Sequence, residues 1–344
     1  MRLLICTQAV DEKDPVLGFF VAWIGRFAHE CERVTVVTLR EGSHALPSNV
    51  QIHVLGRGKF RRAAQLLTLS YRHRTGYDAV FVHMNPEYLV VAGWLWKMLG
   101  KRIGLWYVHK SANIRLRIAR RFVDAIFTAS DTTFPIQDRR IVVTGHGIDV
   151  EASSGARIVH DGFRIATIGR IAPSKQTRLI AEAVCAVATS RPVCLSIYGG
   201  PVTPQESAYE RDLTEWLQEH DTQGIVTMHG IIAHVDVPEV LRGVDLFVNM
   251  GTTGGIDKAV LEAMAAGVPT ISSSPAHAPM LAKYGVALTP VPDVRKIAES
   301  IITIMDMPPE ARRDLGMKLR SEVVSHHSLS SLITRITWIL SRNR

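Results

Sequence analysis

The segment "DLFVNMGTTGGIDKAVLEAMAAGVPTISSS", residues 245–274, contains a strand, a loop, a helix and a second strand. The apolar run "LFVNM" predicts the first strand, and "KAVLEAM" predicts a short helix that ends at Gly267. Val268 and Pro269 then lead into the second strand at "TISSS". A helix between two apolar strands is the repeating unit of a parallel sheet that is covered on both faces.

The same alternation of strands and helices runs along the whole chain. Helical patterns are predicted at 18–32, 86–99 and in the basic segment 114–125. The other predicted strands are "RLLIC", "RVTVVTL", "VQIHVL", "YDAVFVHM", "RIGLWYVH", "IFTAS", "FRIATIGRI", "VCLSIYGG" and "GIVTMHGII". We therefore expect an α/β fold with two doubly wound, Rossmann-like domains that face a central cleft, where ligands bind at the carboxyl ends of the strands.

The length of 344 residues suits two domains better than one core. The stretch 151–162 is rich in small residues and is suited to a linker. We place an N-terminal domain at 1–155 and a C-terminal domain at 156–325. The amphipathic segment 319–343 predicts a helix, and we expect 326–344 to return to the first domain.

The net charge and the cysteines indicate which partners and which cellular compartment suit the protein. Lysine and arginine outnumber aspartate and glutamate by 40 to 32, which gives a formal net charge of +8. This surplus suits nucleotide phosphates, an acidic lipid surface or nucleic acid, but solubility alone would explain it equally well. The chain has no apolar run of membrane-spanning length, and its four cysteines show no metal-binding spacing. We expect a cytoplasmic protein with reduced thiols.

Two cations follow the predicted strand "FRIATI". Gly169 makes the turn after this strand, and Arg170 and Lys175 lie in the following loop. At the carboxyl end of a strand, two cations in one loop can bind a diphosphate, with each charge-assisted hydrogen bond contributing about 1.5–3 kcal/mol. A solvated surface loop would show the same residues, so this pattern alone leaves both interpretations open.

The loop 251–256 is rich in glycine and precedes the helix that begins near Lys258. Bare backbone N–H groups next to a helix N-terminus form an anion site. Asp257 stands at the N-cap position, where plain capping and substrate contact are both open. Glu262 lies about one turn further along, where it can accept hydrogen bonds from ribose hydroxyls or pair with Lys258.

Several motifs together resemble the C-terminal half of the family 4 glycosyltransferases. They are "GRIAPSK", "YGGP", "MHGII", "VPEVLRGVDLFVNMG" and "AVLEAMAAGVPTI", in the order and spacing of that family. The first half of the chain is similar more loosely, through "VLGFFVAWIGRFA", "GKRIGLWYVHKS", "DAIFTAS" and "VVTGHGIDV". The resemblance implies the two-domain GT-B fold and retaining transfer of a sugar from a nucleotide sugar. It also implies that 1–155 is the acceptor-side domain and 156–325 the domain that binds the nucleotide sugar.

The resemblance also implies roles for individual residues. Arg170 and Lys175 would bind the donor diphosphate, and Glu262 would bind the ribose. His109 would face the sugar as a catalytic group, although a histidine at a strand end is more often structural. The remaining donor-binding positions that the resemblance implies are Gly18, Gly199, Gly230, Ile232, Gly254, Gly255, Ile256 and Lys258.

One position departs from the family pattern. The family carries two glutamates separated by seven residues, but Gly254 stands where the first would be. The sequence resembles a variant of the family in which loop amides and an Asp-Lys pair replace that acid. Asp257 is therefore the candidate for the missing catalytic carboxylate, and the identity of the donor sugar is open.

We expect a metal-independent enzyme without a cofactor, whose donor is linked to UDP or GDP. Its acceptor would be a hydroxyl of a glycan or of a lipid-linked molecule. A basic stretch with interleaved apolar residues at 57–74 suggests contact with the anionic inner face of a membrane, with a plain solvated surface as the equal alternative.

Other classes of protein remain as alternatives. A dinucleotide oxidoreductase would need G-x-G-x-x-G after the first strand, and "TQAVDEKDPVLG" lacks it. The basic stretches contain no recognised motif for reading nucleic acid, so we expect no nucleic-acid partner. The strongest alternative is a catalytically impaired protein of the same fold that binds a sugar nucleotide.

Overall fold

The computed structural model describes residues 1–109, 112–130, 134–221, 224–289 and 292–342. The chain forms two compact units. The first comprises Met1–Gly147, Ala233–Val235 and the C-terminal stretch from His326. The second comprises Ile148–Ile232 and Asp236–Ser325.

The described part of the first unit contains a seven-stranded parallel sheet in the order β5-β3-β1-β6-β7-β8-β9. Its strands are β1 Arg2–Cys6, β3 Arg33–Thr38, β5 Val50–Val54, β6 Ala79–His83, β7 Arg102–Trp106, β8 Ala125–Thr128 and β9 Ile141–Val143. Two short strands, β2 Ala9–Val10 and β4 Arg40–Glu41, pair with each other. The helices of this unit are α1 Phe19–Glu30, α2 Lys59–Arg72, α3 Glu87–Met98, α4 Ile114–Ala119 and α12 Leu329–Ser341.

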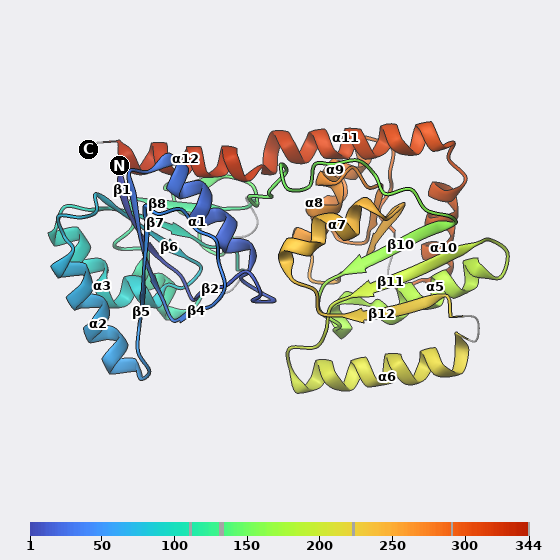
Figure 1. Cartoon of the computed structure of the whole chain (residues 1–344), viewed down its shortest axis with the longest axis horizontal. Helices are drawn as coiled ribbons and strands as arrows, with labels where there is room; N and C mark the ends of the chain where they lie inside the picture. Colours follow the sequence, from blue (N-terminus) through green and yellow to red (C-terminus); the bar gives the residue numbers. More distant parts are fainter. Residues whose placement is uncertain (110–111, 131–133, 222–223, 290–291, 343–344) are drawn as a thin grey trace. The chain divides into compact units, whose positions relative to one another are not determined.

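The inner strands of this sheet, β3, β1, β6, β7 and β8, are buried on both faces. Alternate residues of each strand point to opposite faces. In β1, Leu3 and Ile5 belong to a cluster with apolar residues of α1 and α12, which lie side by side (Figure 1). Leu4 and Cys6 belong to the opposite cluster, which includes residues of α2, α3 and α4. This is why the strands read as continuously apolar in the sequence.

The described part of the second unit contains a five-stranded parallel sheet in the order β12-β11-β10-β13-β14. Its strands are β10 Phe163–Ile168, β11 Val193–Tyr198, β12 Val226–Gly230, β13 Leu246–Asn249 and β14 Thr270–Ser272. Its helices are η1 Pro173–Lys175, α5 Thr177–Ala188, α6 Pro204–His220, η2 His234–Asp236 (which spans the boundary between the units), α7 Val237–Arg242, α8 Lys258–Ala265, η3 Pro275–His277, α9 Ala278–Ala282, α10 Val294–Met305 and α11 Pro309–His327 (which ends in the first unit).

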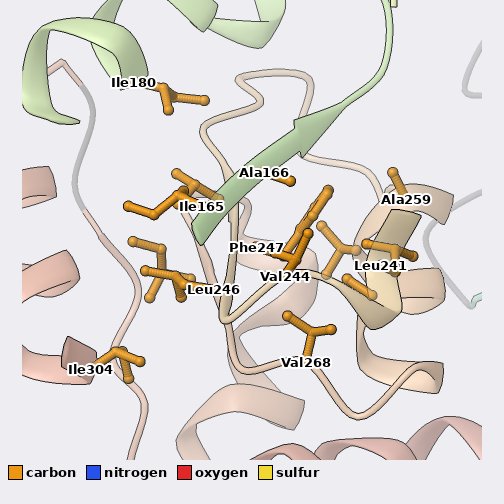
Figure 2. Packing of buried hydrophobic residues seen from close by; sticks show 14 of the residues in the cluster. Ile165, Ala166, Ile180, Leu241, Val244, Leu246, Phe247, Ala259, Val268 and Ile304 are labelled. Carbon is orange, nitrogen blue, oxygen red and sulfur yellow. The ribbon is translucent and has the colours of Figure 1, made fainter. Parts of the chain in front are cut away.

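The core of the second unit forms around the central strand β10 and its neighbour β13. Ile165 of β10 and Phe247 of β13 are almost fully buried. Figure 2 shows them with Leu241 of α7, Ala259 of α8 and Ile304 of α10, which belong to the same cluster. Because the core holds the strands and α8 in place, it also fixes the loops that join them at the carboxyl ends.

The strand–loop–helix–strand unit predicted at 245–274 is confirmed as β13, α8 and β14. The two strands, β13 and β14, pair in parallel. Two helix predictions need correction. The basic helix expected over 114–125 ends at Ala119, and a turn leads into β8. The helix expected over 319–343 is interrupted at Ser328, whose extended backbone and side-chain hydrogen bond to Ser331 N at 3.3 Å cap a new helix.

Candidate functional site

The turns after β10 and β11 lie against each other. Gly169 has φ +146 and donates its N–H to the carbonyl of Tyr198 at 2.9 Å. Gly199 has φ +138, and a Cβ atom there would lie 1.7 Å from the carbonyl oxygen of Gly169. Glycine is therefore required at 199 by backbone contact as well as by conformation. These turns set the point from which Arg170 leaves the sheet.

Arg170 lies at the carboxyl end of β10, as predicted, and its guanidinium is paired. Its Nη1 is 2.7 Å from Oε1 of Glu206. Glu206 also forms a capping box with Thr203 at the start of α6. The hydrogen bond from Val202 N–H and the nearby Arg170 charge both lower the pKa of the Glu206 carboxyl, against the effect of desolvation. About half of the Arg170 side chain remains exposed and can reach a ligand.

Lys175 ends η1 and forms an ion pair with Asp257. Asp257 caps α8, as predicted, by accepting from Ala259 N at 3.3 Å. Asn249, the last residue of β13, donates to the same carboxylate at 3.0 Å. Desolvation opposes ionisation of Asp257, but Lys175 and the Asn249 amide hold the pKa of its carboxyl below the ordinary value. Three elements thus converge on one carboxylate.

The glycine-rich loop is attached at both ends. Thr252 donates its N–H to the carbonyl of Ser174 in η1 at 2.9 Å. Ser274 donates its hydroxyl to the carbonyl of Gly255 at 2.9 Å. Gly254 has φ +67, and a Cβ atom at Gly255 would meet no atom within 4 Å. The loop therefore leaves open space beside Gly255, as a close approach of a ligand to the backbone would need.

His277 was not predicted from the sequence, although it supports the loop directly. Its ring is fully buried, and its Nε2 accepts the N–H of Asp257 at 3.1 Å. Since a backbone N–H only donates, Nε2 carries no proton, and Nδ1 contacts the hydroxyl of Ser272 at 2.8 Å. The serines that end β14 were the available signal, because polar residues at the carboxyl end of a parallel strand mark a site.

Lys258 and Glu262 lie one turn apart on α8. Desolvation lowers the pKa of the Lys258 ammonium to about 7, and the charge of Glu262 opposes this shift. Ile256, two residues before this helix, is partly buried against the core. Lys258 is therefore a cation that can change its charge near neutral pH.

Two of the predicted donor-binding residues, Gly230 and Ile232, lie at the end of β12 and just after it. Gly230 has φ +71 and accepts a hydrogen bond from Gly199 N at 2.8 Å. Ile232 is partly buried against the core. Sequence reasoning missed the neighbouring pair of rings, in which His229 stacks on Tyr198 with centroids 4.4 Å apart. This pair offers a flat surface beside the turn.

The two predicted residues of the first unit have different surroundings. Gly18 precedes α1, and a Cβ atom there would lie 2.7 Å from the carbonyl oxygen of Glu12. Glycine at 18 is thus explained by contact within its own loop. His109 follows β7 and is exposed, with its ring 5.7 Å from that of Tyr107 in an edge-on contact.

The second unit therefore brings most of its predicted residues to one end of the sheet. The cavity between Arg170, Lys175, Tyr198 and Asn249 has a volume of about 10 Å³, close to the space of one water molecule. Among the described residues, no group of three or more His, Cys, Asp or Glu side chains is arranged to hold a metal ion.

Known proteins are similar to this chain at two levels. Residues 162–307 match the family model "Glycosyl transferases group 1". A lipopolysaccharide core biosynthesis mannosyltransferase, LpsB of Rhizobium meliloti, is 28% identical over 163 residues, 44% of this chain and 46% of LpsB. The mannosylfructose-phosphate synthase of Agrobacterium fabrum is 27% identical over 118 residues, 33% of this chain and 26% of the synthase. The chain thus matches less than half the length of these relatives.

The structural similarity extends further than the sequence similarity. HepE of Anabaena, solved in complex with UDP and glucose, superposes with a TM-score of 0.79 over 100% of both chains at 16% identity. At this identity the likeness concerns the fold. The chain has the two-unit, Rossmann-like GT-B fold, and its second unit is related in sequence to the group 1 glycosyl transferases.

Proposed function

We propose that this protein is a retaining glycosyltransferase of family 4. It moves a hexose from a UDP- or GDP-linked donor to a hydroxyl of a glycan or of a lipid-linked acceptor. The observation that carries the proposal is the convergence of Arg170, Lys175 and the start of α8 at the carboxyl ends of β10 and β13. The match to group 1 glycosyl transferases over 162–307 supports it.

The chemistry of the site suits departure of a diphosphate. Negative charge develops on the leaving group, and preformed cations stabilise that charge without reorganising. Arg170 and Lys175 would supply this stabilisation, and Lys258 would add a third cation when protonated. We therefore propose a reaction that needs no metal ion and no cofactor. Glu262 would accept hydrogen bonds from the ribose.

The pairing of Lys175 with Asp257 suggests how the protein compensates for the glutamate that is absent at position 254. A diphosphate that binds Lys175 competes with the carboxylate of Asp257. Once released, Asp257 could accept a hydrogen bond from a hydroxyl of the transferred sugar, the contact that the family assigns to the missing glutamate. The small volume of the cavity fits this view, because binding must open the ion pair to make room.

A catalytically impaired protein that binds a sugar nucleotide is the second candidate. Two observations favour it: Gly254 replaces an acid, and both Arg170 and Lys175 already pair with carboxylates. This candidate predicts binding of the donor without acceptor-dependent release of the nucleotide.

One pair of measurements tests both candidates. A thermal-shift panel of nucleoside diphosphates and their sugars should give stabilisation of about 2.7 kcal/mol at one hundred times Kd. Nucleotide release is then measured with and without glycan acceptors. Lys175→Ala and Glu262→Ala should lose the thermal shift, while Lys296→Ala, an exposed control on α10, should keep it. Equal shifts in all three variants would contradict the assigned roles.

We also propose peripheral contact with an anionic membrane through α2. Phe60 is 94% exposed and Tyr71 is 54% exposed, with Arg74 stacked 4.4 Å above the Tyr71 ring. Exposed aromatic and basic side chains on one helix suit the headgroup region. Within the described ranges, no helix combines the length and the apolar character that a bilayer-spanning segment requires. Flotation with anionic liposomes at low and high salt should show salt-sensitive binding that Phe60→Ser weakens.

A further inference from the structure

The second unit contains a cavity of about 710 Å³ away from the proposed donor site. Phe163, Asp245 and Pro269 line it, and they stand at or just before the starts of β10, β13 and β14. Arg170 follows the carboxyl end of β10, the opposite end of the same parallel sheet. The length of β10 separates the two places by roughly 16 Å, because a strand rises about 3.3 Å per residue.

The lining of this cavity is strongly basic. Among the described residues that line it, one carboxylate, Asp245, faces four arginines: Arg157, Arg312, Arg313 and Arg320. The cavity volume lies within the range of sites for small molecules.

The single carboxylate is already fully engaged. Asp245 is 3.3 Å from Nη2 of Arg157 and 3.4 Å from Nε2 of His160. It also accepts the N–H of Arg164 at 2.9 Å. It can therefore balance Arg157 but not the other guanidinium groups.

Two of the other arginines, Arg312 and Arg320, are held in place by neutral groups. Arg312 donates to the carbonyl of Met305 at 3.0 Å and lies 5.1 Å above the ring of Phe163. Arg320 donates to the carbonyl of Ala265 at the end of α8 and to the hydroxyl of Ser154 at 2.9 Å. These contacts fix the guanidinium groups without neutralising their charge.

Arg313 differs from the other three. Within the described part of the chain its side chain makes no hydrogen bond or ion pair, and the residue is exposed. Desolvation, together with the charges of Arg312 and Arg313, lowers the pKa of Arg157 against the opposing effect of Asp245. The guanidinium groups thus repel one another, and an anion among them would relieve the repulsion.

Apolar side chains also line the cavity and are accessible. Val159 is 95% exposed and Met317 is 55% exposed. A site with several guanidinium groups and an apolar wall suits a molecule that carries both a phosphoryl group and a ring. We propose that this cavity is a second ligand site, which binds a small organic phosphate such as a sugar phosphate or a nucleoside monophosphate.

The test uses calorimetric titration of the full chain with inorganic phosphate, glucose 6-phosphate and UMP. At least one organic phosphate should bind saturably at one site per chain that Lys175→Ala, a substitution in the proposed donor site, leaves intact. Arg313→Glu should weaken this binding about tenfold or more, since it removes a charge-assisted hydrogen bond and adds a repulsive charge. Arg313→Ala, which adds no charge, should weaken it less.

Two control variants distinguish binding in the cavity from nonspecific electrostatic attraction and from binding at the proposed donor site. Arg295→Glu makes the same change in charge at an exposed position of α10 outside the cavity, and it should leave the binding unchanged. Lys175→Ala, which disrupts the proposed donor site, should also leave binding of the organic phosphate in the cavity unchanged. A failure of the donor site would therefore not affect the test of the cavity. Glucose 6-phosphate and UMP as separate arms distinguish the sugar phosphate from the nucleotide.

Three results would overturn the proposal. The first is absence of saturable binding by either organic phosphate. The second is equal weakening by Arg313→Glu and Arg295→Glu, which would indicate nonspecific attraction. The third is binding of inorganic phosphate as tight as that of the organic phosphates, which would exclude recognition of a ring.

Discussion

A Cβ atom at Gly199 would lie 1.7 Å from the carbonyl oxygen of Gly169. The two turns that carry these glycines end β10 and β11, and the first of them positions Arg170. The contact therefore joins the stability of the second unit to the geometry of the proposed donor site.

Gly199→Ala should destabilise the protein by about 3 kcal/mol, because the new methyl group meets backbone and φ is +138. Urea unfolding measures the change in the free energy of unfolding. Gly255→Ala is the matched control, since a Cβ atom there has no neighbour within 4 Å, and it should change this free energy by about 0.5 kcal/mol or less. Equal effects of the two substitutions would contradict the close contact.

Asp257→Asn should tighten the binding of UDP or GDP by about tenfold, because Lys175 would no longer be neutralised by a carboxylate. Asparagine remains a good N-cap, so α8 should persist. Calorimetry measures the affinity, and sugar transfer should fall in the same variant. Asp293→Asn, at the N-cap of α10, controls for the change of cap. Weaker nucleotide binding in Asp257→Asn would show that the carboxylate itself supports the donor.

Donor binding should weaken as pH rises through about 7, because Lys258 loses its proton there. Lys258→Arg, which stays charged, should remove this dependence and leave only the titration of the phosphate groups. Affinity measured by calorimetry between pH 6 and 8.5 decides the matter. Identical profiles in the two proteins would exclude Lys258 as the titrating group.

The free energy of unfolding should increase as pH rises, whereas donor binding weakens. The pKa of Lys258 is lower in the folded protein than in the unfolded chain, so the unfolded chain binds more protons between about pH 7 and the ordinary lysine value. The destabilising effect of burying this ammonium is therefore fully present below about pH 7 and disappears as pH rises through that window. Lys258→Met should be more stable than the unmodified protein at pH 6, and the difference should shrink at pH 9.

His277→Ala should destabilise the protein by about 1–3 kcal/mol, because the N–H of Asp257 loses its acceptor. Hydrogen exchange at the Asp257 amide should become faster. His277→Gln, whose side-chain oxygen can accept the same hydrogen bond, should restore part of the protection. His229→Ala removes an exposed, stacked histidine and should leave this amide unchanged. Unaltered exchange in His277→Ala would show that the ring does not hold the loop.

Most of the fold could be predicted from the sequence, because the apolar residues of its strands and helices follow simple periodicities. A continuously apolar strand such as "RLLIC" exposes apolar side chains on both faces unless both faces are covered. Such strands therefore predict a parallel sheet between two layers of helices. The unit at 245–274 was predicted almost completely for the same reason. The break at Ser328 was missed, because the apolar pattern continues across it and only the local cap interrupts the helix.

The chemistry-bearing residues Arg170, Lys175 and Asp257 could be named from local patterns of charge, glycine and capping. The ion pairs that these residues form could not be predicted, because Lys175 and Asp257 are 82 positions apart in the sequence. Arg170 and Glu206 are 36 positions apart. Such pairs are set by which strands are neighbours in the sheet, and this order depends on the packing of the whole unit. The same holds for His277, which touches Asp257 only because β14 lies beside β13.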